Sequence, residues 1–183
     1  MTAPTHPPSG PLRIRSASAA DNLLLAELGR RTFLETFGPD NTPENMAAYL
    51  EASFGPEIQA AELADPSTLF LIAEVQAEAV GFARLREGPP AQGSSGLNPM
   101  EIVRFYSRQD WIGLGVGPVL MQACLAYARS RGCDVLWLDV WERNTRAQAF
   151  YRKWGFEVVG TQAFQLGSEL QTDLLMQRPI ERK

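Results

Sequence analysis

The sequence predicts a mixed α/β fold, in which a central sheet of parallel and antiparallel strands is flanked by helices. Three observations lead to this class. The chain reads as a strand, two or three helices, three strands, a helix, a strand, a helix and two strands. Residues 101–156 contain a strand, a glycine-rich loop, a helix and a second strand, so one helix should join two parallel strands. Two further pairs of strand-like runs are separated by short turns, as in antiparallel hairpins.

Length and composition favour one domain with a substantial core, since 45% of the 183 residues are hydrophobic. We expect a disordered, proline-rich lead-in over residues 1–11 and a single domain over residues 12–183. The net charge of −4 argues against a nucleic-acid partner. Neither a membrane-spanning apolar run nor a signal peptide is recognisable, so we expect a cytoplasmic protein without membrane contact.

Cysteine and histidine usage excludes several kinds of site. Cys124 and Cys133 do not form a C-x-x-C pair, so we expect two small packing residues and no metal site. The only histidine, His6, lies in the proline-rich lead-in, so histidine-based catalysis within the fold is not expected.

The elements before the central segment carry clear boundary signals. A strand over residues 12–18 is followed by Ser18 and Asp21, which match a capping box at the start of a helix that ends near Gly38. Proline at a first helical position predicts two more helices, over residues 42–54 and 56–64. A hairpin is expected around residues 76–79, a mobile loop over residues 87–99, and a second hairpin around residues 167–168.

The loop in the central segment contains Gly113, Gly115 and Gly117, directly before a helix that we expect to start at Pro118. Glycine lets the backbone come close to a ligand, and the amides at a helix N-terminus attract anions. The loop therefore suits a phosphate or pyrophosphate. A plain strand-to-helix turn explains the same residues.

Two other nucleotide-binding patterns fit less well. A P-loop needs Lys and Ser or Thr after its glycines, and the chain has Pro118 and Val119 there. A Rossmann enzyme, such as an S-adenosylmethionine-dependent methyltransferase, would use an acidic residue near Asp139. However, residues 107–112 separate the strand from the first glycine, which is longer than a Rossmann turn. Asp139 is then better explained as a strand residue with a local hydrogen bond.

Residues 104–117 and 136–156 together resemble the GNAT superfamily of N-acetyltransferases. The second stretch matches its N-x-x-A-x-x-F-Y-x-x-x-G-F pattern, with Asn144, Ala147, Phe150, Tyr151, Gly155 and Phe156. More narrowly, residues 32–54, the LWLDVWERN stretch and the closing LQTDLLM resemble the PaiA-type spermidine/spermine N-acetyltransferase group. The resemblance covers residues 32–176.

This resemblance implies an acyl-CoA N-acyltransferase fold and direct transfer of an acetyl group from acetyl-CoA to a primary amine in a ternary complex. It implies a small-molecule acceptor, with a polyamine as the candidate, and it allows a homodimer because dimers are common among relatives. A methyltransferase and a non-catalytic acyl-CoA-binding module remain the alternatives.

The resemblance also implies roles for individual residues. Glu101 has the spacing of the general base in the superfamily's histone acetyltransferases, and Tyr151 is the candidate acid. The cofactor-binding candidates are Phe105, Tyr106, Ser107, Ile112, Gly113, Leu114, Gly115, Val116, Gly117, Asn144, Ala147 and Tyr151. A backbone N–H near Tyr106 would polarise the thioester oxygen.

The chain departs from the superfamily pattern at two positions. Ile112 stands where members often have Gln or Arg, which leaves backbone amides to hold the pyrophosphate, and Ser107 replaces an aliphatic residue. Basic residues of the last helix could attract the CoA phosphates, namely Arg143, Arg146, Arg152 and Lys153. The acceptor amine is expected between the first two long helices and the central strand, with Glu35, Asp40 and Tyr49 as its candidate contacts.

Overall fold

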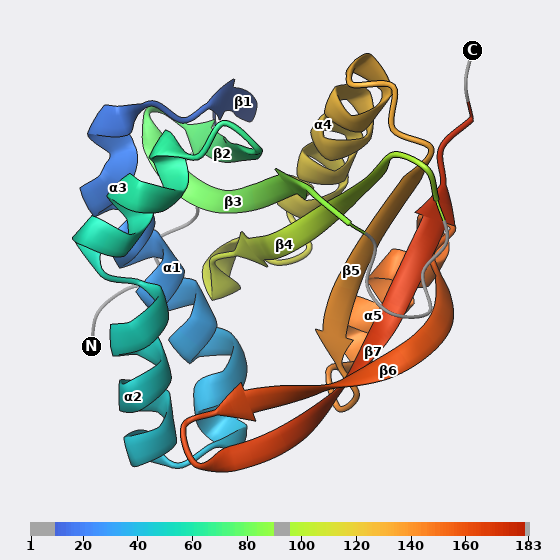
Figure 1. Ribbon diagram of the computed structural model, residues 1–183. Coiled ribbons are helices and arrows are strands. Elements are labelled where there is room, and N and C mark those ends of the chain that lie inside the picture. Colours follow the sequence, from blue (N-terminus) through green and yellow to red (C-terminus); the bar gives the residue numbers. More distant parts are fainter. Residues whose placement is uncertain (1–9, 90–95, 182–183) are drawn as a thin grey trace.

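The computed structural model describes residues 10–89 and 96–181 and contains a seven-stranded mixed sheet with helices on both faces (Figure 1). The strand order is β1-β2-β3-β4-β5-β7-β6. The pair β4–β5 is parallel, and the other neighbouring strands are antiparallel. The predicted fold class is therefore confirmed. His6, most of the expected lead-in and the middle of the expected mobile loop lie outside the described residues.

The strands follow the predicted order along the chain. They are β1 (Arg13–Ser16), β2 (Thr68–Val75), β3 (Glu78–Glu87), β4 (Pro99–Ser107), β5 (Val135–Trp141), β6 (Glu157–Leu166) and β7 (Glu169–Pro179). Gln76 and Ala77, between β2 and β3, both have positive φ values, as in a type I′ hairpin turn. Both predicted hairpins are present.

The longer helices are α1 (Asn22–Phe37), α2 (Pro43–Ser53), α3 (Pro56–Ala64), α4 (Val116–Ser130) and α5 (Thr145–Lys153). Three short 3₁₀ turns accompany them, namely η1 (Ala19–Asp21), η2 (Gly38–Asp40) and η3 (Gln109–Trp111). Proline occupies the first position of α2 and of α3, as predicted. Among the described helices, none combines the length and the apolar character needed to cross a membrane.

The start of α4 differs from the prediction, which placed it at Pro118. The helix begins at Val116, because Gly115 takes a left-handed conformation with φ of 90° and serves as its N-cap. Pro118 is then the third helical residue. Its missing N–H still costs nothing, since the first N–H groups of a helix have no partner within the helix.

The sheet splits between β4 and β5, and this split positions the site. The two strands pair only between Pro99–Ile102 and Val135–Leu138. Beyond Ile102, β4 stays with β3 and β5 stays with β7, so the strands separate into a fork (Figure 1). The register of β3 with β4 shifts near Arg84, which leaves Val103 as the extra residue of a β-bulge. The bulge bends β4 away from β5.

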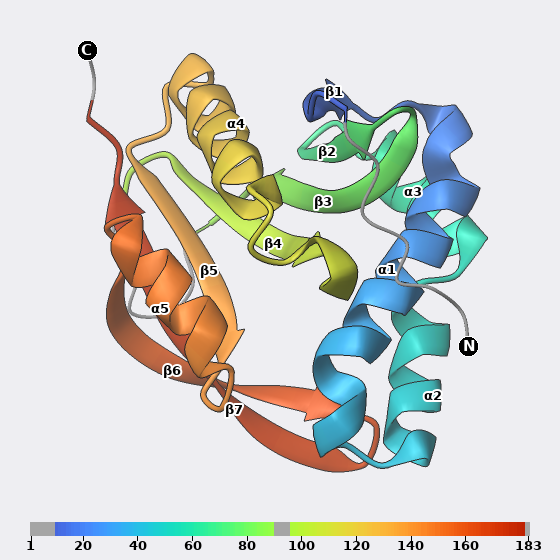
Figure 2. The same cartoon turned by 180° about the vertical axis from the view of Figure 1, so that it is seen from behind.

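Two hydrophobic clusters lie on opposite faces of the sheet. One cluster packs beneath α4 and α5, which cover the same face (Figure 2), and includes both cysteines as buried free thiols. The other cluster joins α1 and α2 to β2 and β3 around Phe33, Phe54 and Phe82. The β6–β7 hairpin reaches α2, where Ser168 N donates to Asn45 Oδ1 at 2.9 Å. The hairpin therefore closes the lower side of the fork.

Candidate active site

A cavity of about 580 Å³ fills the fork between β4 and β5. It brings together most of the predicted site residues, namely Tyr49, Glu101, Phe105, Tyr106, Ser107, Ile112, Gly113, Gly115, Gly117, Asn144, Ala147 and Tyr151. It lies between α1, α2 and β4, where the acceptor was expected. Leu114, Val116 and Glu35 do not line it.

At one end of the cavity, the backbone before α4 is open to a ligand. Gly113 and Gly115 have φ values of 84° and 90°, and a Cβ on either would meet no atom within 4 Å. Val116 is 1% exposed and anchors the helix start in the core, whereas Leu114 is exposed. These two residues can therefore contribute backbone amides, not side chains, to an anion at the helix N-terminus.

Tyr151 lies on α5 within a group of aromatic rings. Its ring centroid is 6.1 Å from that of Phe105, 5.6 Å from that of Phe150 and 5.8 Å from that of Phe156. Burial raises the pKa of Tyr151 well above its usual value, and the Cys124 thiol adds to this rise. The phenol is therefore a proton donor at neutral pH.

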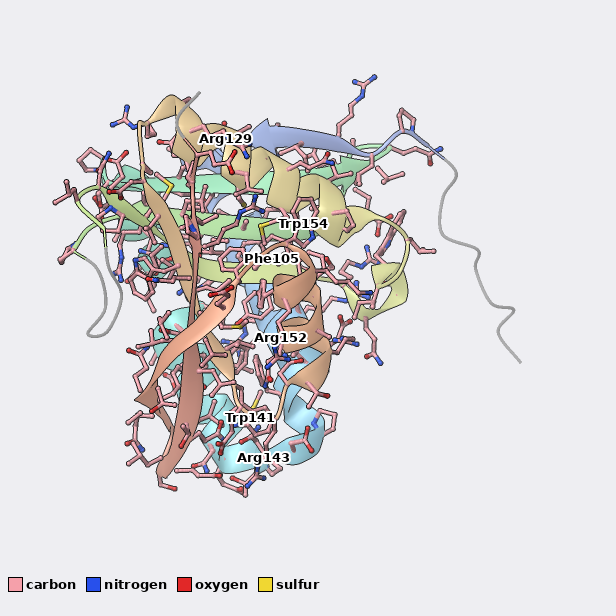
Figure 3. All side chains as sticks on the ribbon, turned by 90° about the vertical axis from the view of Figure 1, so that its right-hand side faces the viewer. Phe105, Arg129, Trp141, Arg143, Arg152 and Trp154 are labelled. Carbon is pink, nitrogen blue, oxygen red and sulfur yellow. The ribbon has the colours of Figure 1, made fainter. Side chains whose placement is uncertain are left out.

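Asn144 and the basic residues of α5 hold different positions. Asn144 caps α5, where its Oδ1 accepts a hydrogen bond from Ala147 N at 3.1 Å, and it also lines the cavity. Arg146 lines the same cavity, whereas Arg143 lies over the Trp141 ring at 5.8 Å and lines a smaller neighbouring cavity (Figure 3). Arg152 lies farther along the helix, where it donates to Gln148. Neither Arg152 nor Lys153 reaches either cavity.

Three carboxylates line the fork on the side that faces α1 and α2. Glu101 is 8% exposed, and its Oε2 accepts from Arg86 Nε at 3.0 Å and from Arg86 Nη2 at 2.5 Å. Burial raises the pKa of Asp139 to about 7, and the charge of Glu101 adds to this effect. Burial raises the pKa of Asp173 to about 6. The fork therefore combines a carboxylate that is paired with Arg86 and two whose pKa values are raised.

The sequence prediction for Asp139 was correct in part, and Asp173 was missed. Asp139 has a local hydrogen bond, since its Oδ2 accepts from Gln162 Nε2, but it also lines the cavity. Asp173 faces Trp141 across the β5–β7 pair. A signal was present in the sequence, because LWLDVW places Asp139 inside an otherwise apolar run and LQTDLLM places Asp173 directly before one.

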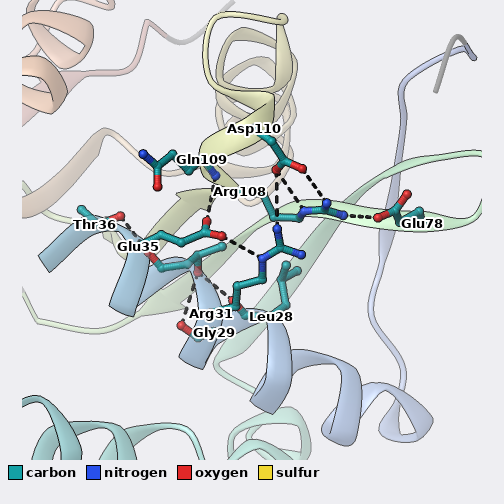
Figure 4. A network of polar contacts seen from close by, with 10 residues as sticks. Leu28, Gly29, Arg31, Glu35, Thr36, Glu78, Arg108, Gln109 and Asp110 are labelled. Carbon is teal, nitrogen blue, oxygen red and sulfur yellow. Dashed lines mark hydrogen bonds and ion pairs between the residues drawn. The ribbon is translucent and has the colours of Figure 1, made fainter. Parts of the chain in front are cut away.

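Glu35 does not take the predicted place in the acceptor region. Its carboxylate accepts from Arg31 Nε and from the backbone N of Gln109, both at 2.8 Å (Figure 4). Gln109 begins η3, directly before the glycine loop. Glu35 thus joins α1 to that loop, and Asp40 lines the smaller cavity with it.

Tyr49 does lie in the expected region. Its ring stacks on Phe33 with centroids 4.4 Å apart, and burial raises the pKa of its phenol. Within residues 10–89 and 96–181, no group of three or more His, Cys, Asp or Glu side chains has the arrangement of a metal site.

The fork, the open helix N-terminus and the tyrosine on α5 define an acyltransferase architecture. The model of the acetyltransferase (GNAT) family matches residues 30–156. The chain belongs to this family. The described strands do not form the doubly wound parallel sheet that a Rossmann methyltransferase would need.

The sequences and structures of relatives match this chain over nearly its whole length. An uncharacterised N-acetyltransferase from the pepI 3′ region of Lactobacillus delbrueckii subsp. lactis is 32% identical over 169 residues, which cover 92% of this chain and 98% of the relative. An uncharacterised N-acetyltransferase of Mycobacterium tuberculosis is 33% identical over 156 residues, or 85% of this chain and 96% of the relative. The crystal structure of a PaiA N-acetyltransferase from Thermoplasma acidophilum, solved with coenzyme A, has a TM-score of 0.76 at 22% identity and matches 92% of this chain and 99% of that one. At this identity the match concerns the fold.

Proposed function

We propose that this chain transfers the acetyl group of acetyl-CoA directly to a primary amine of a small molecule, with a polyamine as the acceptor class. Membership of the GNAT family makes the chain an N-acetyltransferase, and acetyl-CoA is its co-substrate. The observation that carries the proposal is a single cavity that connects the open backbone before α4 with buried carboxylates across the fork. Such a cavity can hold a pyrophosphate at one end and an amine at the other.

The described residues fit coenzyme A at the glycine end. Gly113 and Gly115 leave the backbone uncovered, and the helix dipole of α4 favours negative charge there. Arg146 lies on the cavity wall. A PaiA-type N-acetyltransferase of the same fold, from Thermoplasma acidophilum, was solved with coenzyme A, which supports this assignment.

The thioester group belongs in the fork beside β4. From Val103 onward, the edge of β4 that faces β5 has no strand partner, so backbone N–H groups near Tyr106 are available to polarise the thioester oxygen. Acetyl-CoA supplies the activated acetyl group. The reaction forms an amide C–N bond and breaks the C–S bond. An acceptor that arrives as an ammonium ion loses two protons in all: one is released to solvent, and the other matches the proton gained by the sulfur.

We assign the first proton transfer to Asp139, although the sequence resemblance pointed to Glu101. Arg86 already holds the Glu101 carboxylate. A general base works best when its pKa lies near the working pH, and the pKa of Asp139 is raised to about 7 by burial and by Glu101. Glu101 then attracts the acceptor ammonium and keeps the pKa of Asp139 high. Glu101 itself remains the second candidate for the base.

We assign the second proton transfer to Tyr151. Its pKa is raised by burial, so the phenol stays protonated and can donate to the leaving sulfur. Phe105 and Phe150 flank it, which limits competing water. Asp139 takes one proton from the ammonium before attack and passes it to solvent. The second proton, lost by the nitrogen after attack, replaces the one that Tyr151 gives to the sulfur.

The test is turnover of acetyl-CoA with a panel of amines. The purified chain is mixed with acetyl-CoA and one amine at a time, thiol release is followed with a thiol reagent, and the acetylated product is identified by mass spectrometry. We expect amine-dependent thiol release. Tight binding of acetyl-CoA without turnover on any amine would instead favour a non-catalytic acyl-CoA-binding module.

A further inference from the structure

One part of the cavity, a limb between α1, α2 and the strands, has an aromatic wall. Six rings from three strands and two helices line it, namely Phe33, Phe37, Tyr49, Tyr106, Trp141 and Phe164. These six residues form the aromatic wall. Apart from Tyr49, an expected acceptor contact, and the backbone near Tyr106, none of these residues has a role in the acetyl transfer assigned above.

The rings of the aromatic wall contact one another in a continuous series. Phe33 lies 4.4 Å from both Phe37 and Tyr49, measured between ring centroids. Phe37 continues to Trp141 at 5.9 Å, and Tyr49 continues to Phe164 at 5.3 Å. The wall therefore spans from β5, across α1 and α2, to β6. Aromatic faces carry negative electrostatic potential and attract organic cations.

Asp173 lies in the same limb, and the hydrogen-bonding capacity of its carboxylate is only partly used. Its side chain lines the cavity, the residue is only 8% exposed, and its Oδ1 has no hydrogen-bond partner among the described residues. Its position is fixed by the sheet, because it pairs with Trp141 on β5 and with Gln162 on β6. Its negative charge reaches Tyr49 and Tyr106, since it adds to the rise in pKa that burial causes in both phenols.

Two arginines near this limb are already paired with glutamates. Arg104 is bound to Glu62 through two nitrogen–oxygen contacts of 2.5 and 3.0 Å, and Arg86 is bound to Glu101. None of the ion pairs between described residues includes Asp173. A buried carboxylate without a counter-charge is costly, so such groups commonly belong to binding sites.

We propose that Asp173 and the aromatic wall bind a second ammonium group of the acceptor, separate from the amine that is acetylated. The preferred acceptor is then a linear alkyl diamine or longer polyamine. One amine reaches the fork beside Glu101 and Asp139, and the other, still protonated, lies against Asp173 with its methylene groups on the rings. This inference rests on the proposed function and names Asp173 as a specificity-determining residue.

The test compares matched acceptors that differ only in the second charge. Values of kcat/KM are measured for n-alkylamines and for α,ω-diaminoalkanes of three to eight carbons, at fixed acetyl-CoA. We expect a diamine of one optimal length to exceed its monoamine by about 30-fold or more, because a desolvated charge pair is removed in the monoamine. Equal values at every length would overturn the proposal.

Variants then test which residues cause the preference for diamines over monoamines. Asp173→Asn should reduce the ratio of diamine to monoamine to roughly 3-fold or less. Glu157→Gln removes the same charge from an exposed residue at the start of β6 and should leave the ratio as in the wild type. A ratio that survives Asp173→Asn would refute the role of Asp173. Phe164→Leu, which removes one ring, should lower the ratio by a few-fold and provides a second variant if Asp173→Asn does not fold.

A binding measurement separates this inference from the proposed function. Calorimetry with a diaminoalkane and no acetyl-CoA should detect binding to the wild type that Asp173→Asn weakens by at least about 10-fold. If no amine is acetylated while this binding is present, the proposed function is wrong and the subsite is correct. If amines are acetylated while the diamine binds no more tightly than the monoamine, the subsite is wrong and the function stands.

Discussion

Arg86 and Glu101 face each other across the β3–β4 pair, and both Nε and Nη2 of Arg86 donate to the same oxygen of Glu101, Oε2. Glu101 also lines the cavity. The contact with Arg86 ties the charge of Glu101 to the sheet, whereas the Oδ1 of Asp139 has no partner among the described residues. The two carboxylates therefore differ in their hydrogen-bond partners, and their variants should behave differently.

The first prediction concerns the acidic limb of the pH–rate profile. If Asp139 is the base, Asp139→Asn should lower kcat by about 100-fold or more. It should also remove the fall in rate below about pH 7 from the pH–rate profile. Glu101→Gln should keep the limb but move it to lower pH, because the charge that helps raise the pKa of Asp139 is gone. The measurement is kcat/KM against pH for both variants. The opposite pattern, with the limb lost only in Glu101→Gln, would assign the base to Glu101.

The second prediction concerns Tyr151. Tyr151→Phe keeps the packing against Phe105, Phe150 and Phe156 but removes the proton donor. We expect kcat to fall by roughly 100-fold while the Kd for acetyl-CoA changes little. Calorimetry and single-turnover kinetics measure the two quantities separately. An unchanged rate of the chemical step would remove Tyr151 from the proton path.

The third prediction uses two glycines with similar backbones. Gly115 and Gly132 have φ values of 90° and 68°, and a Cβ on either meets no atom within 4 Å. Alanine at either position should cost about 1–2 kcal/mol of unfolding free energy, since left-handed conformations disfavour a Cβ. Only Gly115→Ala should also weaken acetyl-CoA binding, because only Gly115 lies beside the proposed pyrophosphate site. Equal acetyl-CoA affinity in the two variants would argue against that site.

The fourth prediction concerns stability and pH. Burial raises the pKa values of Asp139 and Asp173 to about 7 and about 6, above the value near 3.9 of an unfolded chain. The folded state therefore binds more protons than the unfolded state at mildly acidic pH. Its stability should fall as pH rises from about 4 to about 8.

Asparagine at position 139 or 173 should remove this loss. After allowance for partial contact with solvent, we expect Asp139→Asn and Asp173→Asn each to be more stable than the wild type by about 1–2 kcal/mol at pH 8, and nearly equal to it at pH 4. Urea unfolding at the two pH values provides the measurement. A constant difference between variant and wild type would show that neither group titrates as described.

The fifth prediction concerns the contact between Glu35 and Gln109. Glu35→Ala should free η3 from α1 and loosen the loop that follows it. We expect the KM for acetyl-CoA to rise by about 3- to 10-fold with a smaller change in kcat, because ordering of the loop then costs binding energy. Glu27→Ala, at an exposed position of the same helix, is the control. Similar kinetics in both variants would mean that the contact does not order the loop.

Several elements could be predicted because their signals are local. The third helix has the predicted bounds, since Gly55-Pro56 and Asp65-Pro66 mark both ends. The start of α4 was misplaced by two residues, because a left-handed glycine cap can precede a proline at several helical positions. The position of Glu35 could not be predicted, since its partner Gln109 is distant in the sequence and carries no complementary side-chain signal.

The sequence by itself determined the fold class, the order of the elements and the glycine loop before a helix, because hydrophobic periodicity and turn residues act over short distances. Only the tertiary structure decided which carboxylates share the cavity. Glu101, Asp139 and Asp173 come from three strands, and they meet because β4 and β5 separate after Ile102 and because β7 pairs with β5 in one register. Pairing between distant strands depends on the packing of the whole sheet, which no local pattern encodes.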